Sequence, residues 1–102
     1  MDWLWTWGGK SFGYREGDTL WTYDGSHVGQ FDGDEIYGRK GEYLGEVMSD
    51  NRLIVNKSKR SYRRSPFSPY ARRASYARYA NYAGYAMYAG YEEFPPPEQF
   101  MA

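Results

Sequence analysis

The sequence predicts an all-β fold of four short hairpin repeats of 16 residues, followed by a largely disordered C-terminal tail. Three observations predict it: residue types recur every 16 positions, glycines recur every eight, and the composition changes after about residue 63. We therefore divide the chain into a repeat domain at 2–63 and a basic, Tyr/Ala-rich low-complexity tail at 64–102 that ends in a proline-rich segment.

Columns of like residues define the four units as 2–17, 18–33, 34–49 and 50–65. One column holds only aspartate: Asp2, Asp18, Asp34 and Asp50. A second column is aliphatic, with Leu4, Leu20 and Ile36. A short period of this kind indicates that one supersecondary unit has been copied along the chain.

Five glycines at intervals of eight residues predict the turns. They are Gly9, Gly17, Gly25, Gly33 and Gly41. Each follows a Gly, Glu, Asp or Lys, which favours type I′ turns with positive φ at both central residues. Between these pairs lie six residues rich in strand-forming types, so each unit reads as a hairpin and the domain as a meander of up to eight strands. A helix is rejected for 1–57, because each interior glycine costs about 1 kcal/mol.

Three further glycines fall in the middle of predicted strands, namely Gly13, Gly29 and Gly45. Glycine there marks a bulge, a bend or the close approach of another backbone. The fourth unit is degenerate: Arg52 occupies the aliphatic column, and a slip of one residue would bring Leu53 onto it. The pattern leaves open whether its second strand forms and whether the fourth hairpin closes.

The stretches LWTYDGSHVGQFDGDEIYG, GGKSFGYR and KGEYLGEV resemble the four-fold β-flower domain family over about residues 2–63. The resemblance implies four short hairpins about a pseudo-fourfold axis. It implies no biochemical activity and carries over no functional residue. A domain of about 60 residues is marginally stable and cannot hide all of its large rings, so self-association is expected.

The tail contains a run of Tyr-Ala-x triplets between residues 76 and 91. On an α-helix these tyrosines would spread around the whole axis, and on a strand they would alternate between faces. Only a form with three residues per turn, polyproline II or 3-10, aligns them. We predict that the tail is disordered when isolated, with a helix as the open alternative.

Charge is segregated along the chain: the net charge is −4 over 1–57, +7 over 58–79 and −3 over 80–102. The basic stretch is interpreted as a solvated linker that lies back on the acidic domain. The alternative is single-stranded RNA or DNA binding, because arginine contacts phosphates and tyrosine stacks on bases. The residues of that alternative are Arg63, Arg64, Arg72, Arg73, Arg78, Tyr70, Tyr76 and Tyr79. Anionic lipid is a third candidate, and the closing EEFPPPEQF resembles a proline-rich docking ligand or a stiff spacer.

The sequence offers little catalytic chemistry. His27 is the only histidine, cysteine is absent, and Ser11 and Ser26 have no evident base beside them. We therefore predict a non-enzymatic structural or protein-interaction module with no catalytic residue, metal or cofactor, whose partner is an unknown protein or a second copy. A cation held by the aspartate column is the open alternative. Because no signal peptide or membrane span is evident, a cytoplasmic location is expected.

Overall fold

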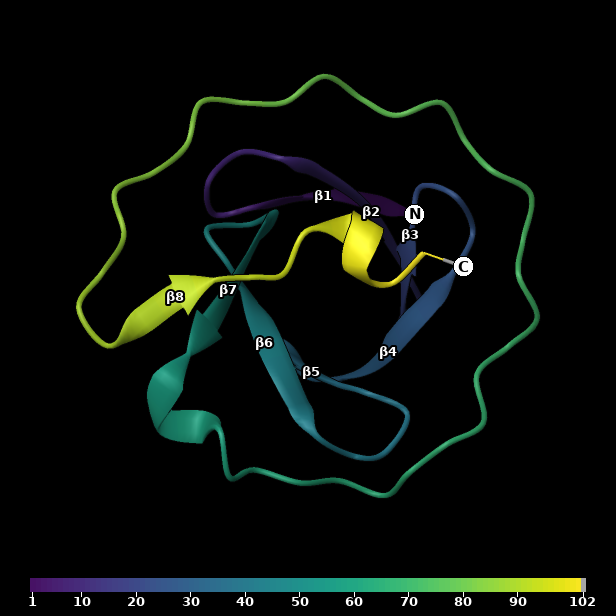
Figure 1. The fold of residues 1–102 in the computed structure, drawn as a ribbon, viewed down its shortest axis with the longest axis horizontal. Helices are drawn as coiled ribbons and strands as arrows, with labels where there is room; N and C mark the ends of the chain where they lie inside the picture. The colour runs from purple at the N-terminus through teal and green to yellow at the C-terminus, as the bar shows by residue number, and fades with distance from the viewer. Residues whose placement is uncertain (102) are drawn as a thin grey trace.

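One sheet closes into a barrel in the computed structural model, which describes residues 1–101 (Figure 1). Seven strands form the barrel in chain order. They are β1 (Asp2–Thr6), β2 (Ser11–Glu16), β3 (Thr19–Thr22), β4 (His27–Asp32), β5 (Glu35–Tyr37), β6 (Tyr43–Met48) and β7 (Arg52–Asn56). The 3-10 helix η1 (Lys57–Lys59) follows β7, and the tail adds an eighth strand, β8 (Tyr91–Glu93), and the 3-10 helix η2 (Pro97–Gln99). The all-β prediction is confirmed.

The barrel closes through a parallel pairing between its first and last strands. Each strand from β1 to β7 runs antiparallel to the next, but Trp5 and Thr6 of β1 pair in parallel with β7. A meander with an odd number of strands must close in this way, because its two end strands point in the same direction. The number is odd because the fourth repeat continues into η1 after one strand, and residues 54–56 of β7 pair with β8 from the far end of the chain.

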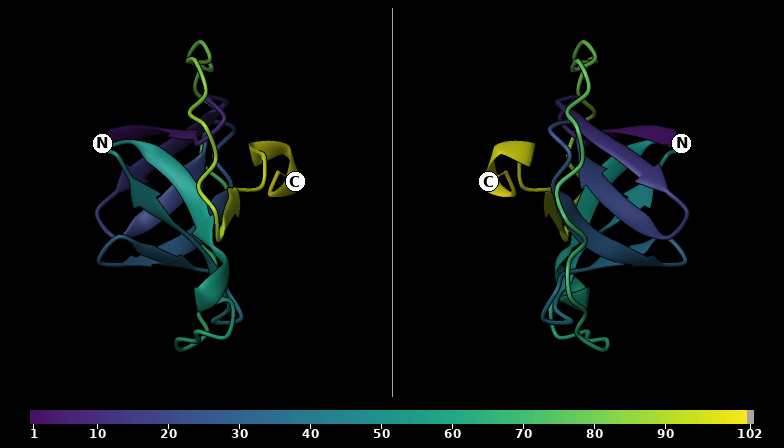
Figure 2. Two further views of the ribbon diagram at one scale, coloured as in Figure 1. Left: turned by 90° about the vertical axis from the view of Figure 1, so that its left-hand side faces the viewer. Right: turned by 90° about the vertical axis from the view of Figure 1, so that its right-hand side faces the viewer.

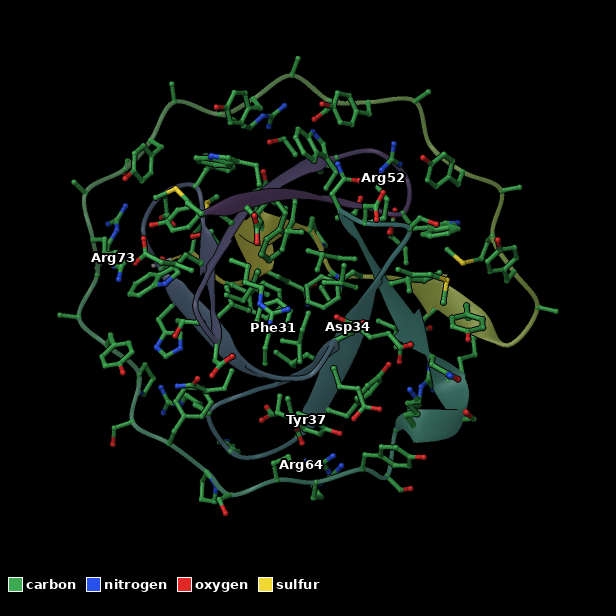
Figure 3. The ribbon with its side chains drawn as sticks, turned by 180° about the vertical axis from the view of Figure 1, so that it is seen from behind. Phe31, Asp34, Tyr37, Arg52, Arg64 and Arg73 are labelled. Carbon is green, nitrogen blue, oxygen red and sulfur yellow. The ribbon has the colours of Figure 1, made fainter. Side chains whose placement is uncertain are left out.

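The fourth repeat is shifted by one residue relative to the others. The turns that lead into β3 and β5 contain two residues, whereas Met48 pairs with Arg52 and leaves three residues in the turn before β7. The extra residue brings Leu53 to the aliphatic column, where it is fully buried in the core. The slip considered from the sequence is confirmed, and Arg52 lies on the outer face of the barrel (Figure 3).

Each mid-strand glycine stands opposite a bulge. The pairing register shifts after Leu4, Leu20 and Ile36, the residues that face Gly13, Gly29 and Gly45. A Cβ atom on Gly29 would lie 2.6 Å from the carbonyl oxygen of Tyr37, closer than side chains tolerate. The predicted bulges and close backbone approaches are confirmed.

The predicted turn type is wrong. All five turn glycines have positive φ, but among the described residues only Ser49 and Asp50 share that property without being glycine. Gly17 and Gly33 occupy the first position of two-residue turns, as in type II′. At the other end of the barrel, Gly9, Gly25 and Gly41 each donate their N–H to the carbonyl three residues earlier. Each is therefore the last residue of a β-turn and has a positive φ.

The C-terminal segment closes one end of the barrel. Phe94 is fully buried and packs edge-on against Phe12, with ring centroids 5.4 Å apart, and Phe100 lies beside both rings. Figure 1 shows η2 lying over this end of the barrel. The proline-rich run, expected as a docking ligand or a spacer, thus carries a core residue, and Pro97 is buried as well.

The prediction of a disordered tail is wrong, and the helical alternative is wrong too. Residues 60–90 run around the barrel as an extended segment, which we call the strap, and return as β8 (Figure 1). Side views place the strap around the end that η2 covers, with the N-terminus at the opposite end (Figure 2). The prediction failed because the barrel wall supplies hydrogen-bond and packing partners that an isolated tail lacks.

Candidate interaction surface

The strap N–H groups that donate hydrogen bonds to the barrel are separated by three residues or a multiple of three. The strap amides that donate to barrel carbonyls are those of Arg64, Phe67, Arg73, Tyr76, Tyr82 and Tyr85. Between them, the N–H of Tyr70 donates to the Nδ1 atom of His27 at 2.9 Å. The period of three in the Tyr-Ala-x run is therefore the period with which this extended chain faces the barrel.

Alanine carbonyls supply the complementary contacts. The indole N–H groups of Trp5 and Trp7 donate to the carbonyls of Ala80 and Ala86, each at 2.9 Å. Between these two, the carbonyl of Ala83 accepts from Arg52 at 3.0 Å. The triplets that begin at Tyr82 and Tyr85 thus turn both the tyrosine N–H and the alanine C=O inward, while the alanine side chains are exposed.

The strap and the barrel repeat in step with each other. The amides of Arg64, Arg73 and Tyr82 donate to the carbonyls of Gly41, Gly25 and Gly9. Nine strap residues therefore correspond to one 16-residue barrel unit, and the strap meets the units in reverse order. A Cβ atom on any of these three glycines would collide with a strap carbonyl, whereas nothing lies within 4 Å of one at Gly17 or Gly33.

Aromatic rings cover the outer wall beneath the strap. Trp5 stacks on Tyr82 with centroids 4.2 Å apart, and Trp3 meets Tyr79 edge-on at 4.7 Å. Trp7 packs against Tyr85 and the neighbouring Tyr88. The strap thereby covers rings that a bare barrel would expose, and Trp7 is only 2% exposed.

Arg52 fastens the strap where the barrel closes. Its side chain is 4% exposed and has no carboxylate partner among the described residues. Instead it donates to the carbonyls of Trp7 and Ala83, and its guanidinium lies 4.1 Å from the ring centre of Tyr85. The residue that made the fourth unit look degenerate is therefore a contact between barrel and strap (Figure 3). Sequence reasoning missed this role, and an arginine in an aliphatic column was the available signal.

Several residues of the predicted nucleic-acid surface bind the barrel. Arg64 pairs with Asp32 at 2.6 Å and Arg73 with Glu16 at 2.7 Å. Arg72 pairs with Asp24 at 3.0 Å. Figure 3 shows Arg64 over Tyr37, with the guanidinium 4.5 Å from the ring centre.

The other residues of the predicted nucleic-acid surface also contact the protein itself. Arg63 bonds to nearby backbone carbonyls, and Arg78 lies 5.9 Å from the ring centre of Tyr23. The three predicted tyrosines pack against rings of the barrel: Tyr70 against His27, Tyr76 against Tyr14, and Tyr79 against Trp3. The predicted nucleic-acid residues thus all lie in the strap, but many of their side chains contact the barrel.

His27 is half-buried in an aromatic stack. Its ring packs with Trp21, Phe67 and Tyr70 at centroid distances of 5.0 to 5.2 Å. Its Nε2 atom lies 3.2 Å from the carbonyl oxygen of Gly29, while Nδ1 accepts from Tyr70. These contacts suit the neutral ring, and burial lowers the pKa of His27 below its usual value.

A second cluster, which sequence reasoning also missed, joins η1 to the third repeat. The ammonium of Lys59 lies 2.9 Å from Glu35 and 3.0 Å from Glu46. Tyr37 and Tyr43 donate their hydroxyls to the same two carboxylates. The hydrogen bond from Lys59 lowers the pKa of Glu35, and burial together with Glu35 raises that of Tyr37 to about 12. All five groups are satisfied by one another.

The aspartate column gathers at the open end of the barrel. Three of its four members, Asp2, Asp34 and Asp50, line a hollow there together with Arg15. The guanidinium of Arg15 lies over the ring of Phe31 and approaches Asp34 at 4.0 Å; Phe31 and Asp34 are labelled in Figure 3. Among residues 1–101, no group of acidic or histidine side chains has the geometry to hold a metal ion.

Comparison with known families gives one match, a family described as 4-fold beta flower protein, over residues 1–92. The chain belongs to the 4-fold beta flower protein family. The match confirms the resemblance seen in the repeats, and it also spans the strap and the first two residues of β8 in this β-flower protein. No curated protein and no solved structure matches it significantly. No helix among the described residues is long and apolar enough to cross a membrane.

Proposed function

We propose that this β-flower protein is a non-enzymatic protein-interaction module and that the strap is its contact surface. The supporting observation is a belt of half-exposed aromatic rings. Seven strap tyrosines are 42% to 61% exposed: Tyr62, Tyr70, Tyr76, Tyr79, Tyr82, Tyr85 and Tyr88. Met87, at 43% exposed, lies in the same belt.

Tyrosine belts of this kind suit a protein partner. Tyrosine is enriched in protein interfaces because it offers a large apolar area and a polar end with few rotatable bonds. The barrel already fixes the strap backbone through hydrogen bonds such as those from Tyr82 and Tyr85. A partner therefore meets a preorganised surface and loses less conformational entropy on binding. The partner can be another protein or a second copy of this chain.

The repeat arrangement extends the same proposal. We infer that the four units are set about a pseudo-fourfold axis, because turn glycines, bulges and strap contacts recur with a period of 16. Successive quarters of the belt would then offer similar contact sites. Such a belt can contact a partner with matching repeats, or several partners at once.

The proposal is tested by placing charge on the belt without disturbing its contacts with the barrel. The side chains of Ala77, Ala80 and Ala83 are exposed, so a triple change to glutamate should leave the fold intact. The control is Lys40→Glu with Gln99→Glu, which alters exposed residues outside the belt and changes the net charge by the same amount.

The two variants are compared in affinity capture from extracts and in light scattering across a concentration series. We expect the triple variant to lose the captured protein, or the self-association, that the wild type and the control retain. Equal behaviour of the triple variant and the wild type would rule out the belt as the contact surface.

Single-stranded nucleic-acid binding remains a prediction to be measured directly. Phosphates would compete with the carboxylates that now pair with Arg64 and Arg73. Those pairs are exposed, so each contributes little to stability. Fluorescence anisotropy of a labelled single-stranded RNA with the full chain, at low and high salt, measures this binding.

A further inference from the structure

A groove of about 400 Å³ lies between the barrel, the strap and the C-terminal segment. Its walls come from the start of β4, from the β5–β6 loop and from strap residues 69–72. Val28, Leu44 and Phe100 form an apolar part of the lining, and Arg39 and Arg72 line it as well. A volume of this size, mainly apolar with a few polar groups, is typical of small-molecule sites.

Two polar groups of the groove are not used by the protein itself. The hydroxyl of Ser26 is buried and has no hydrogen-bond partner among the described residues. Such a group is costly to leave unpaired. The exposed Arg39 pairs with no carboxylate among residues 1–101, although its neighbour Glu42 also lines the groove. The Oε1 atom of Glu42 accepts from the backbone N–H of Lys40 at 3.1 Å.

The repeat shows which chemistry belongs in this groove. The groove can be compared with the same place one barrel unit earlier. The corresponding barrel residue has a number lower by 16, and the corresponding strap residue has a number higher by nine, because the strap meets the units in reverse order. There, Asn81 stands in place of Arg72, and its side-chain oxygen accepts from the backbone N–H of Ser11 at 2.9 Å. Lys10 stands in place of Ser26 and pairs with the carboxylate of Glu98 at 2.7 Å. The protein thus fills the earlier groove with an acceptor oxygen and a carboxylate.

In the open groove, no side chain accepts from the equivalent N–H of His27, as far as residues 1–101 extend. Arg72 turns instead toward Asp24, bonding its carboxylate and its carbonyl. The groove therefore offers the N–H of His27 and the guanidinium of Arg39 as donors beside an apolar lining, and the one acidic side chain of the lining, Glu42, accepts from the backbone N–H of Lys40.

We propose that this groove binds a small organic acid with an apolar body. The carboxylate takes the place held by the side-chain oxygen of Asn81 in the earlier unit, where it meets the N–H of His27. The guanidinium of Arg39, from the groove lining, supplies the cation that Lys10 supplies to Glu98 in the earlier unit. The body of the ligand packs on Val28, Leu44 and Phe100. Because strap residue Tyr70 also lines the groove, such a ligand bridges the barrel and the strap.

The test is an NMR titration of the full chain with 2-naphthoate, and with 2-naphthamide as its uncharged counterpart. We expect naphthoate to shift the amide signals of Ser26, His27 and Tyr70, and naphthamide to bind at least about tenfold more weakly. Arg39→Gln removes one charged donor from an exposed turn, and it should weaken naphthoate binding about tenfold. Arg78→Gln, a strap arginine outside the groove, should leave the binding unchanged.

A second variant tests the comparison between units. Arg72→Asn places in the groove the amide that the earlier unit carries, so it should abolish naphthoate binding while the spectrum stays that of a folded protein. The proposal is overturned if naphthoate and naphthamide bind alike, if the shifted signals lie elsewhere, or if Arg39→Gln and a folded Arg72→Asn bind as the wild type does.

Discussion

Gly25 and Gly33 allow docking of the strap to be separated from strain in the turn. Both have positive φ, 89° and 61°. An alanine at either site therefore costs roughly 1–2 kcal/mol for the left-handed backbone alone. Nothing lies within 4 Å of a Cβ atom at Gly33, whereas one at Gly25 would come well within 3.0 Å of the carbonyl oxygen of Arg73.

The collision at Gly25 forces the strap away from the barrel. Its departure breaks the 2.9 Å hydrogen bond from the N–H of Arg73 to the carbonyl of Gly25, a loss of about 1 kcal/mol. It also removes the guanidinium of Arg73 from the ring of Trp21, which it approaches to 3.9 Å, for a further loss of about 0.5–2 kcal/mol. We expect Gly25→Ala to lower the free energy of unfolding by about 2.5–5 kcal/mol, and Gly33→Ala by about 1–2 kcal/mol.

Urea unfolding of both variants, followed by far-ultraviolet circular dichroism and tryptophan fluorescence, measures these free energies. The native Gly25→Ala protein should also emit at longer wavelength, because Trp21 loses part of its cover. If the two alanines destabilise equally and native emission is unchanged in both, the strap contributes nothing at Gly25 and our account of docking is refuted.

Three further outcomes are expected. Lys59→Met leaves Glu46 without a cation and Glu35 with only the guanidinium of Arg64 at 3.4 Å, and it should cost about 2 kcal/mol in urea unfolding at pH 7. Because the folded-state pKa of Glu35 is lowered, its contribution in the wild type is complete above about pH 4.5 and is lost as the pH falls through the folded value. Because the pKa of His27 is lowered in the folded state, wild-type stability also decreases as the pH falls below about 6.5. His27→Gln should remove this part of the pH dependence, and an unchanged dependence of unfolding free energy on pH would contradict the prediction. Hydrogen exchange should protect the amides bonded to the barrel and leave their neighbours fast, and uniform exchange along the strap would refute the contact period. The protected amides are those of Arg64, Phe67, Tyr70, Arg73, Tyr76, Tyr82 and Tyr85.

The barrel was largely predictable because its signals are local. A glycine with positive φ, such as Gly41, and a glycine opposite a bulge, such as Gly45, are each required by the conformation of a few neighbouring residues. The slip in the fourth unit was visible for the same reason, since Leu53 is the next aliphatic residue after Arg52. The turn type was missed because a glycine at one position is common to several turns.

The strap was not predictable because its partners lie far away in the sequence. Tyr82 bonds to Gly9, and Trp7 bonds to Ala86. The sequence did show that only a three-residue period aligns the tyrosines. It did not show that the barrel wall carries hydrogen-bond partners at a matching spacing. Arg52 was likewise uninterpretable in isolation, because its acceptors are backbone carbonyls, which every sequence contains.

The strap also explains how so small a barrel tolerates four tryptophans. A single closed sheet has one interior, and here the aliphatic column and phenylalanines such as Phe12 fill it. The tryptophans therefore lie outside, and a stable domain needs a second layer to cover them. An extended chain provides that layer with few residues, and its backbone contacts hold the tyrosine backbone while the side chains stay partly exposed. The outer layer is therefore ordered by the barrel while its tyrosine rings remain half-exposed, and this combination is what a preorganised contact surface requires.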